Sequence, residues 1–148
     1  TEYTNQPGLA MIGASTANDA GYTGSGITIN VVDSGIYSQH LDIDHTNYSN
    51  GANYSNSGNA SDCNGHGTHV SGIIAAKRDG IGMRGVAYGA KVTDTTIANC
   101  DGDISMSDAT WGAMILSESH FDQQKKYIVP DQQDNILTTL RPVAMQNK

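Results

Sequence analysis

The chain has 148 residues and a formal net charge of −7, with 37% hydrophobic and 6% aromatic residues. Nucleic acids and anionic membrane surfaces are bound through basic patches, so this acidic balance excludes both as expected partners. No run of residues has the length and apolarity of a membrane span, and the hydrophobic content suffices for a lean core.

The first predicted element is a buried strand over residues 27–32. Its sequence, Ile-Thr-Ile-Asn-Val-Val, is rich in β-branched residues and runs directly into Asp33. The strand therefore delivers a carboxylate at its C-terminal tip. Open α/β sheets place their active sites at this end of their strands.

The next segment, residues 47–61, is rich in asparagine, serine and glycine and is predicted to be a loop without regular structure. A helix is predicted over residues 66–76, because Val70, Ile73 and Ile74 recur at the spacing of one helical face. Small residues are expected to let this helix lie close to the sheet: Gly72, Ala75 and Ala76.

A second strand is predicted over residues 90–96 and a second helix over residues 107–116. Ser107 is suited to cap this helix, and Asp108 favours its positive end. Strands and helices that alternate in this order predict an α/β layer built on a parallel sheet.

Two residues of these elements have the chemistry of hydrolase catalysis. His66 lies at a glycine-rich entry to the first predicted helix, and Asp33 precedes it in the chain. A histidine can act as general base for a hydroxyl nucleophile, while an aspartate behind it orients the ring and stabilises the imidazolium. Asp before His is also the order of one known hydrolase triad. Taken alone, Asp33 in an Asp-Ser-Gly sequence is ordinary turn chemistry.

The motifs around both residues resemble those of the subtilisin-like serine peptidases. Asp-Ser-Gly-Ile at residues 33–36 is similar to the family's aspartate motif. Asn-Gly-His-Gly-Thr-His-Val-Ser-Gly at residues 64–72 is similar to its histidine motif. The resemblance covers roughly residues 16–118. Within it, residues 79–88 are closest in wording to the subtilases of bacterial autotransporters.

The resemblance implies an α/β, parallel-sheet, three-layer subtilisin-like fold, of which this chain carries the N-terminal half. Residues 1–118 are assigned to the peptidase domain and residues 119–148 to an unassigned tail. The charge changes near this boundary: residues 1–122 hold 13 acidic and 4 basic side chains, whereas residues 123–148 hold 2 and 4. The remainder of the peptidase domain is an expected partner of these residues.

The nucleophile of the implied triad is missing. The family's Gly-Thr-Ser-Met motif occurs nowhere, and Ser105-Met106-Ser107 lacks its glycine and proline. The resemblance implies a serine-type endopeptidase that hydrolyses extended polypeptides, with Asp33 and His66 as catalytic residues and the serine supplied elsewhere. Loss of such a serine costs about as much as loss of the whole triad, so this chain alone is expected to be inactive. A truncated or degenerate subtilase that binds peptides without cutting them is the alternative.

Cys63 and Cys100 are the two cysteines of the chain. The resemblance places both between the loop before His66 and the substrate rim, which implies a disulfide that stabilises the fold by about 3–4 kcal/mol. Such a bond needs an oxidising compartment, in keeping with a protein that is secreted or held on a bacterial cell surface. Two free thiols are the alternative, and a zinc site of Cys63, His66 and His69 is a weaker one. Otherwise His69 is expected to be a buried, hydrogen-bonded packing residue.

The resemblance also implies a structural calcium ion. Asp42 stands where the family has an aspartate ligand, and the loop over residues 77–83 has the family's length. Besides Asp42, the implied ligands are the Asp79 side chain and three backbone carbonyls, those of Lys77, Ile81 and Met83. Gln6 is a candidate for one more oxygen. Calcium takes six to eight oxygen ligands, so the set is chemically reasonable, and a solvated surface turn is the alternative.

Residues 101–104 are similar to the family's edge strand, which pairs with an extended peptide. In such β-augmentation the backbone hydrogen bonds give affinity and side-chain pockets give preference. The residues that the resemblance implies in substrate contact are Gly102, Asp103, Ile104, Met106 and Ala109. A charged loop ahead of a capped helix, with no ligand, is the alternative.

Overall fold

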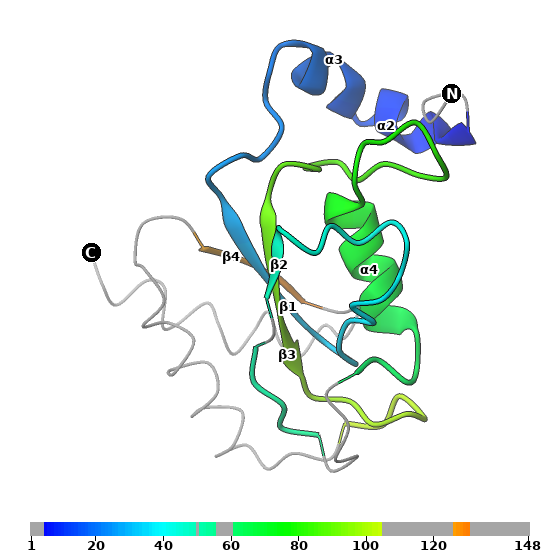
Figure 1. Ribbon diagram of the computed structural model, residues 1–148, viewed down its shortest axis with the longest axis vertical. Coiled ribbons are helices and arrows are strands. Elements are labelled where there is room, and N and C mark those ends of the chain that lie inside the picture. Colours follow the sequence, from blue (N-terminus) through cyan, green and yellow to red (C-terminus); the bar gives the residue numbers. More distant parts are fainter. Residues whose placement is uncertain (1–4, 50, 56–60, 105–125, 131–148) are drawn as a thin grey trace.

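The computed structural model describes residues 5–49, 51–55, 61–104 and 126–130 of the chain (Figure 1). Four strands form one parallel sheet in the order β2-β3-β1-β4. The strands are β1 (Thr28–Asp33), β2 (Tyr48–Ser49), β3 (Lys91–Thr96) and β4 (Lys126–Pro130). The strands predicted over residues 27–32 and 90–96 are β1 and β3, and the predicted parallel α/β fold is confirmed.

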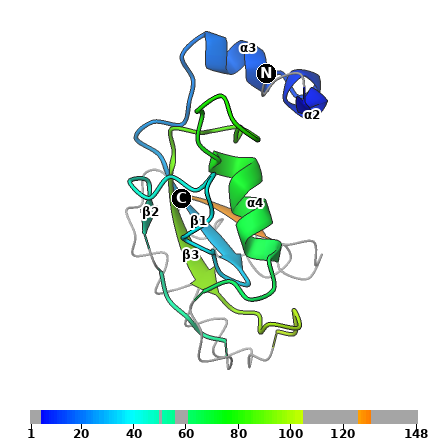
Figure 2. The ribbon, with the colours of Figure 1, turned by 45° about the vertical axis from the view of Figure 1, so that its right-hand side comes forward.

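The helices of the described residues are α2 (Pro7–Met11), α3 (Ala14–Asp19) and α4 (His66–Ala75). Helix α4 is the one predicted over residues 66–76, and it runs along one face of the sheet (Figure 1, Figure 2). Helices α2 and α3 span five and six residues, too few for a periodic apolar pattern to reveal them. None of the described helices has the length and hydropathy that crossing a lipid bilayer requires.

Strand β1 lies between β3 and β4, and its register with β3 sets the position of the carboxyl edge. Thr28 opposes Lys91, and Asp33, the last residue of β1, opposes Thr96, the last residue of β3. Because parallel strands end at the same edge of a sheet, the chain that follows β1 and the chain that follows β3 leave the sheet together. Residues from both segments can therefore meet around Asp33.

The two faces of the sheet differ in polarity. The core on the side of α4 consists of five buried residues: Val31, Ile36, Ile43, Ala75 and Val92. Successive side chains of a strand point to opposite faces, so Asn30 lies on the other side. The buried Asn30 amide donates to Thr95 Oγ1 (3.0 Å), and its Oδ1 accepts from Thr93 Oγ1 (3.0 Å). These bonds compensate for the burial of a polar group.

Close approach of α4 to the sheet depends on glycines that the sequence did not single out. A Cβ atom on Gly67 would lie 2.1 Å from the carbonyl oxygen of Gly35. A Cβ atom on Gly85, in the loop before β3, would lie 2.4 Å from the backbone nitrogen of Ala75, so this glycine lets the loop pass close to the end of α4, and Ala75 itself is buried in the core. The expectation for Gly72 is wrong, because a Cβ atom there would meet only the Met83 side chain, whose sulfur would lie 3.8 Å away.

The predicted apolar face of α4 is wrong in one member. Val70 and Ile74 pack against the core, whereas Ile73 is 47% exposed. The buried stripe of the helix runs through Gly67, Ser71 and Ala75. Residue 73 lies about 200° around the helix from residue 71, so its side chain points away from the sheet.

The predicted loop over residues 47–61 is wrong at its start, where Tyr48 and Ser49 form β2. They pair with Val92 and Thr93 of β3. Main-chain pairing of so short a strand needs no apolar pattern, and only Tyr48 packs against the core. The helix predicted over residues 107–116 lies outside the described residues.

Candidate active site

Asp33 ends β1 with its side chain on the face that α4 covers. Alternation along the strand places it on the same side as Val31, two residues earlier. The carboxylate is buried, and its Oδ1 accepts a hydrogen bond from the backbone N–H of Ser34 (2.7 Å). The fold thus presents a shielded carboxylate to the first turn of α4.

His66 is the first residue of α4. Gly65, just before it, has a φ angle of +99°, a conformation that glycine adopts without strain. His66 Nδ1 lies 2.9 Å from each of the two carboxylate oxygens of Asp33. The His66 side chain is 44% exposed and that of Asp33 only 5%. The carboxylate therefore holds one edge of a ring that stays accessible from solution.

This contact determines which ring nitrogen is basic. A carboxylate against Nδ1 favours the proton on that nitrogen, so Nε2 is the basic atom of the neutral His66 ring. When the ring gains a second proton, the nearby carboxylate stabilises the positive charge. His66 is thus arranged as a general base, with the Asp33 carboxylate orienting its ring.

A second carboxylate, Asp62, lies beside the pair, and the sequence motifs gave it no role. It accepts five hydrogen bonds, from the side chain of Ser34 and from residues 64, 65 and 68. Burial alone would raise the pKa of Asp62, but the hydrogen bonds from Thr68, Gly65 and Ser34 outweigh it and lower the pKa. The signal in the sequence is an aspartate just before a helix start, where carboxylates accept from backbone N–H groups.

Cys63 and Cys100 form a disulfide, with their Cα atoms 4.9 Å apart. It joins the loop before His66 to the segment after β3, and the Asn64 side-chain amide donates to the Cys100 carbonyl oxygen (3.1 Å). The zinc hypothesis is wrong, because a disulfide sulfur cannot serve as a thiolate ligand. Across the described residues, no three His, Cys, Asp or Glu side chains are grouped for a metal ion.

Comparison with known protein families matches the subtilase family to residues 24–129, which include both Asp33 and His66. The chain belongs to the subtilase family. The match passes residue 118, where the peptidase portion was expected to end, and reaches into β4. Membership confirms the resemblance that the two motifs indicated.

Several curated subtilases are similar to this one. An extracellular serine protease of Serratia marcescens is 46% identical over 104 residues, which are 65% of this chain and 10% of that protein. Subtilisin E of Bacillus subtilis (strain 168) is 42% identical over 60% of this chain and 24% of its own length. Subtilisin Savinase of Lederbergia lenta is 38% identical over 71% and 38%. The chain thus spans between a tenth and two fifths of these relatives, and the expected location outside the cell agrees with the Serratia name.

The prediction of an edge strand over residues 101–104 of this subtilase is wrong, because this segment is a tight turn followed by a single isolated bridge. The backbone N–H of Gly102 donates to the Asn99 carbonyl oxygen (3.0 Å), and Ala98 and Ile104 form an isolated antiparallel bridge. Residues 101–104, Asp103 among them, are exposed. The two other predicted contact residues, Met106 and Ala109, lie outside the described residues.

The predicted calcium ligands are gathered around one loop. The Asp42 carbonyl oxygen accepts from the Lys77 N–H (2.9 Å), and a Cβ atom on Gly82 would lie 3.0 Å from Asp42 Oδ2. The missing side chain at residue 82 thus makes room beside the Asp42 carboxylate. Ile81 and Met83, whose carbonyls were predicted as ligands, flank this glycine.

Two members of the predicted calcium set are engaged with protein groups. Asp79 Oδ1 accepts from the Ile81 N–H (3.0 Å), and Asp79 Oδ2 lies 3.7 Å from Lys77 Nζ. Gln6 Oε1 accepts from the Arg84 N–H (2.7 Å). The donor set fits a calcium ion in its oxygen chemistry and in the position of Asp42, but a bound ion would compete with Lys77 for Asp79.

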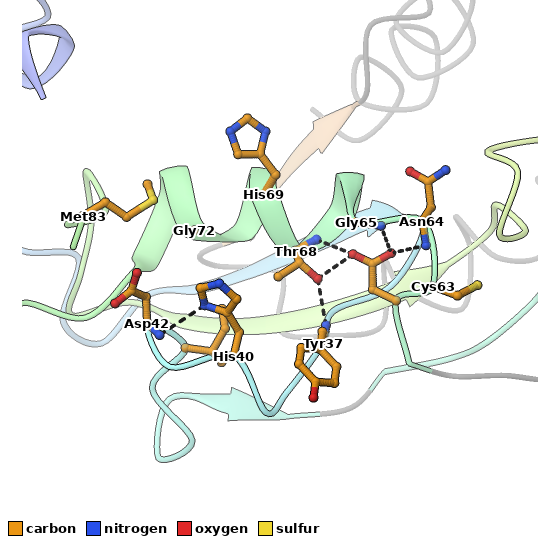
Figure 3. A pocket seen from close by; sticks show the side chains of 12 residues that line it. Tyr37, His40, Asp42, Cys63, Asn64, Gly65, Thr68, His69, Gly72 and Met83 are labelled. Atoms are coloured by element: carbon orange, nitrogen blue, oxygen red, sulfur yellow. Dashed lines mark hydrogen bonds between the residues drawn. The ribbon is translucent and has the colours of Figure 1, made fainter. Parts of the chain in front are cut away.

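A pocket of about 410 Å³ lies between α4 and the segment that follows β1 (Figure 3). His69 lines it and is exposed, so the expectation of a buried packing histidine is wrong. Residue 69 lies about 200° around the helix from Gly67, which faces the sheet. The opposite wall includes Tyr37, whose backbone N–H donates to Thr68 Oγ1 (2.8 Å) (Figure 3). The pocket is lined by neither Asp33 nor His66.

Proposed function

We propose that this subtilase chain supplies the acid and the base of a serine-type endopeptidase. The observation that supports the proposal most directly is the 2.9 Å approach of His66 Nδ1 to both oxygens of Asp33. His66 Nε2 removes the proton from a serine hydroxyl as its oxygen attacks the carbonyl carbon of a peptide bond. When the carbon–nitrogen bond breaks, the same nitrogen returns the proton to the leaving amine. Asp33 keeps the ring oriented and stabilises the imidazolium.

The serine belongs to polypeptide outside these 148 residues, because no Gly-Thr-Ser sequence occurs among them. The chain by itself carries out no acyl-enzyme chemistry, since the acid and base have no hydroxyl to activate. The remainder of a subtilase domain is therefore its necessary partner. Extended polypeptides are the substrate.

Covalent labelling tests this division of roles. The 148-residue chain is treated with a serine-directed phosphonate and should gain no adduct mass. The same chain joined to a subtilase C-terminal half that bears Gly-Thr-Ser-Met should gain one adduct, and a His66→Ala variant should lose it. Labelling of the short chain alone would contradict the proposal. A joined protein that binds extended peptides but stays unlabelled would favour the non-catalytic binding module.

The substrate backbone pairs with residues 102–104, and Met106 and Ala109 are two further substrate-contacting residues by their position in the family's sequence pattern. The support is positional: the disulfide ties this segment to the loop that precedes His66. Exposed Asp101 and Asp103 favour basic residues in the substrate. The whole protein acts outside the cell, on the surface of a bacterium that displays it as an autotransporter. Cell fractionation, with detection of the chain at the surface, tests the location.

Calcium stabilises the loop over residues 77–83 through Asp42, Asp79 and backbone carbonyls. The support is the Asp42 carboxylate, which lies against the side-chain-free Gly82. When bound, the ion supplies stability and takes no part in peptide hydrolysis. Calorimetric titration should show calcium binding, and the heat should disappear in Asp42→Asn.

A further inference from the structure

Asp62 contacts both sides of the proposed catalytic pair without touching either of its members. It accepts five hydrogen bonds from three parts of the chain: the residue after β1, the loop before α4 and the first turn of α4. The catalytic roles proposed above do not use this residue. Its contacts therefore need a separate explanation.

One set of contacts leads to His66. Asp62 Oδ1 accepts from the backbone N–H groups of Asn64 (3.1 Å) and Gly65 (2.8 Å), the two residues that precede His66. Asp62 Oδ2 accepts from both the backbone N–H (2.8 Å) and the hydroxyl (2.5 Å) of Thr68. The residues on either side of His66 are thus held by one carboxylate. This fixes the direction in which the His66 side chain leaves the helix.

The other set of contacts leads to Asp33. Ser34 Oγ donates to Asp62 Oδ1 (2.9 Å) and accepts from the N–H of Gly67 (3.0 Å). The backbone N–H of Ser34 in turn donates to Asp33 Oδ1 (2.7 Å). Ser34 therefore couples the carboxylate of Asp62 to that of Asp33 on one side and to the first turn of α4 on the other.

We propose that Asp62 is a positioning residue, which holds the His66 ring and the Asp33 carboxylate in register and so keeps the proton on His66 Nδ1. This rests on the proposed role of His66 as general base. Only a ring held with Nδ1 toward Asp33 presents an unprotonated Nε2 to a nucleophile. Asp62 acts through the backbone of α4 and through Ser34, and it touches no reacting atom.

The ionised form of Asp62 is the one that can do this, because every contact of its side chain is a donor. The hydrogen bonds lower its pKa against the effect of burial, so it is a carboxylate at neutral pH. The segments around the ring carry other charged or titratable groups: Asp33 on β1, His69 one turn along α4, and the exposed Asp101 and Asp103 in the disulfide-linked turn. The test must therefore separate geometry from charge.

The experiment compares Asp62→Asn with Asp44→Asn in the full chain labelled with ¹⁵N-histidine. In Asp62→Asn the side chain keeps its shape but presents an NH₂ group to the surrounding donors. Asp44 is a matched control, since it also accepts backbone and hydroxyl hydrogen bonds, from Thr46 (2.9 and 2.7 Å), but lies away from the pair. Ring-nitrogen chemical shifts report the tautomer of neutral His66. A change of charge alone leaves the Nδ1–H form in place, whereas a loss of register does not.

We expect the wild type and Asp44→Asn to hold His66 as the Nδ1–H tautomer and Asp62→Asn to shift it toward Nε2–H. In the complete peptidase, Asp62→Asn should lower kcat about 100-fold with little change in KM. An unchanged tautomer in a folded Asp62→Asn variant would overturn the proposal, even if its melting temperature fell.

If Asp62→Asn does not fold, Ser34→Ala and Thr68→Val decide the question, because each removes one link and leaves Asp62 in place. Either should raise the Nε2–H population, and no shift in both would overturn the proposal. The tautomer measurement needs no nucleophile. If the His66 tautomer shifts as expected but the joined protein is not labelled by the phosphonate, only the proposed peptidase function is contradicted. If the joined protein is labelled but the tautomer does not shift, only the role of Asp62 is contradicted.

Discussion

Two regions of this subtilase use carboxylates in opposite ways. At the carboxyl edge of the sheet, Asp33 and Asp62 are surrounded by hydrogen-bond donors from the residue after β1, the loop before α4 and the first turn of α4. At the loop over residues 77–83, the Asp42 carboxylate lies against Gly82 and accepts no hydrogen bond within the described part of the chain. The two regions lie at opposite ends of α4, which begins at His66 and ends at Ala75, just before the loop (Figure 1).

The difference shows how the protein environment selects the role of a carboxylate. Donors that are already in place hold the group in one orientation, which suits the alignment of a catalytic ring. A carboxylate without donors keeps its oxygens available for a cation. We therefore expect substitutions in the first region to change catalysis, and substitutions in the second to change calcium-dependent stability.

The largest effect should come from Asp33→Asn in the complete peptidase. Asparagine keeps the size of the side chain but stabilises the wrong His66 tautomer, so kcat should fall on the order of 10⁴-fold, as in other serine peptidases. Hydrolysis of a chromogenic peptide measures it. Asp44→Asn should retain wild-type kcat, and equal losses in the two variants would mean that Asp33 acts only through stability.

Two alanine substitutions in α4 should differ in their effect on stability, because one glycine is tightly packed and the other is not. Gly67→Ala places a methyl group against the Gly35 carbonyl oxygen and should lower the free energy of unfolding by about 3 kcal/mol. Gly72→Ala meets only the flexible Met83 side chain and should be neutral or stabilising by up to about 1 kcal/mol. Urea unfolding provides both values. Equal costs would show that α4 packs differently from the structure.

Calcium should stabilise the fold through Asp42. At a free calcium concentration about 100 times the dissociation constant, binding should add about 2.7 kcal/mol to the free energy of unfolding. Scanning calorimetry with calcium and with a chelator measures the gain, which Asp42→Asn should abolish and Asp44→Asn should retain. If calcium does not stabilise the wild type, the loop over residues 77–83 is a solvated turn without a calcium ion.

The smallest effect should be a pH dependence that belongs to Asp62. Its pKa is lowered in the folded protein, below the ordinary aspartate value of about 3.9 in the unfolded chain. Its contribution to stability is therefore complete above the unfolded pKa and is lost as the pH falls through the folded one. Unfolding of the wild type and Asp62→Asn should differ most at neutral pH and converge on acidification. A gap that stays constant with pH would contradict this.

Local sequence patterns were enough to predict β1 and β3, the helix that begins at His66 and the family. These features depend on local patterns: a β-branched run that ends in Asp33, a glycine-rich turn before His66, and two motifs in a specific order. Such patterns can be recognised from the sequence because they are formed by residues that are close together in the chain.

Which side chains contact one another depends on the packing of segments that are far apart in the chain. The contacts of Asp62 join residues from three segments, and a single aspartate in a loop carries no pattern that would reveal them. The outward direction of Ile73 and His69 depends on which stripe of α4 the sheet covers, and this is set by the close contact at Gly67. Strand β2 likewise exists only because β3 offers a partner for its main chain. In each case the deciding interaction links residues far apart in the chain, and local propensity contains no information about it.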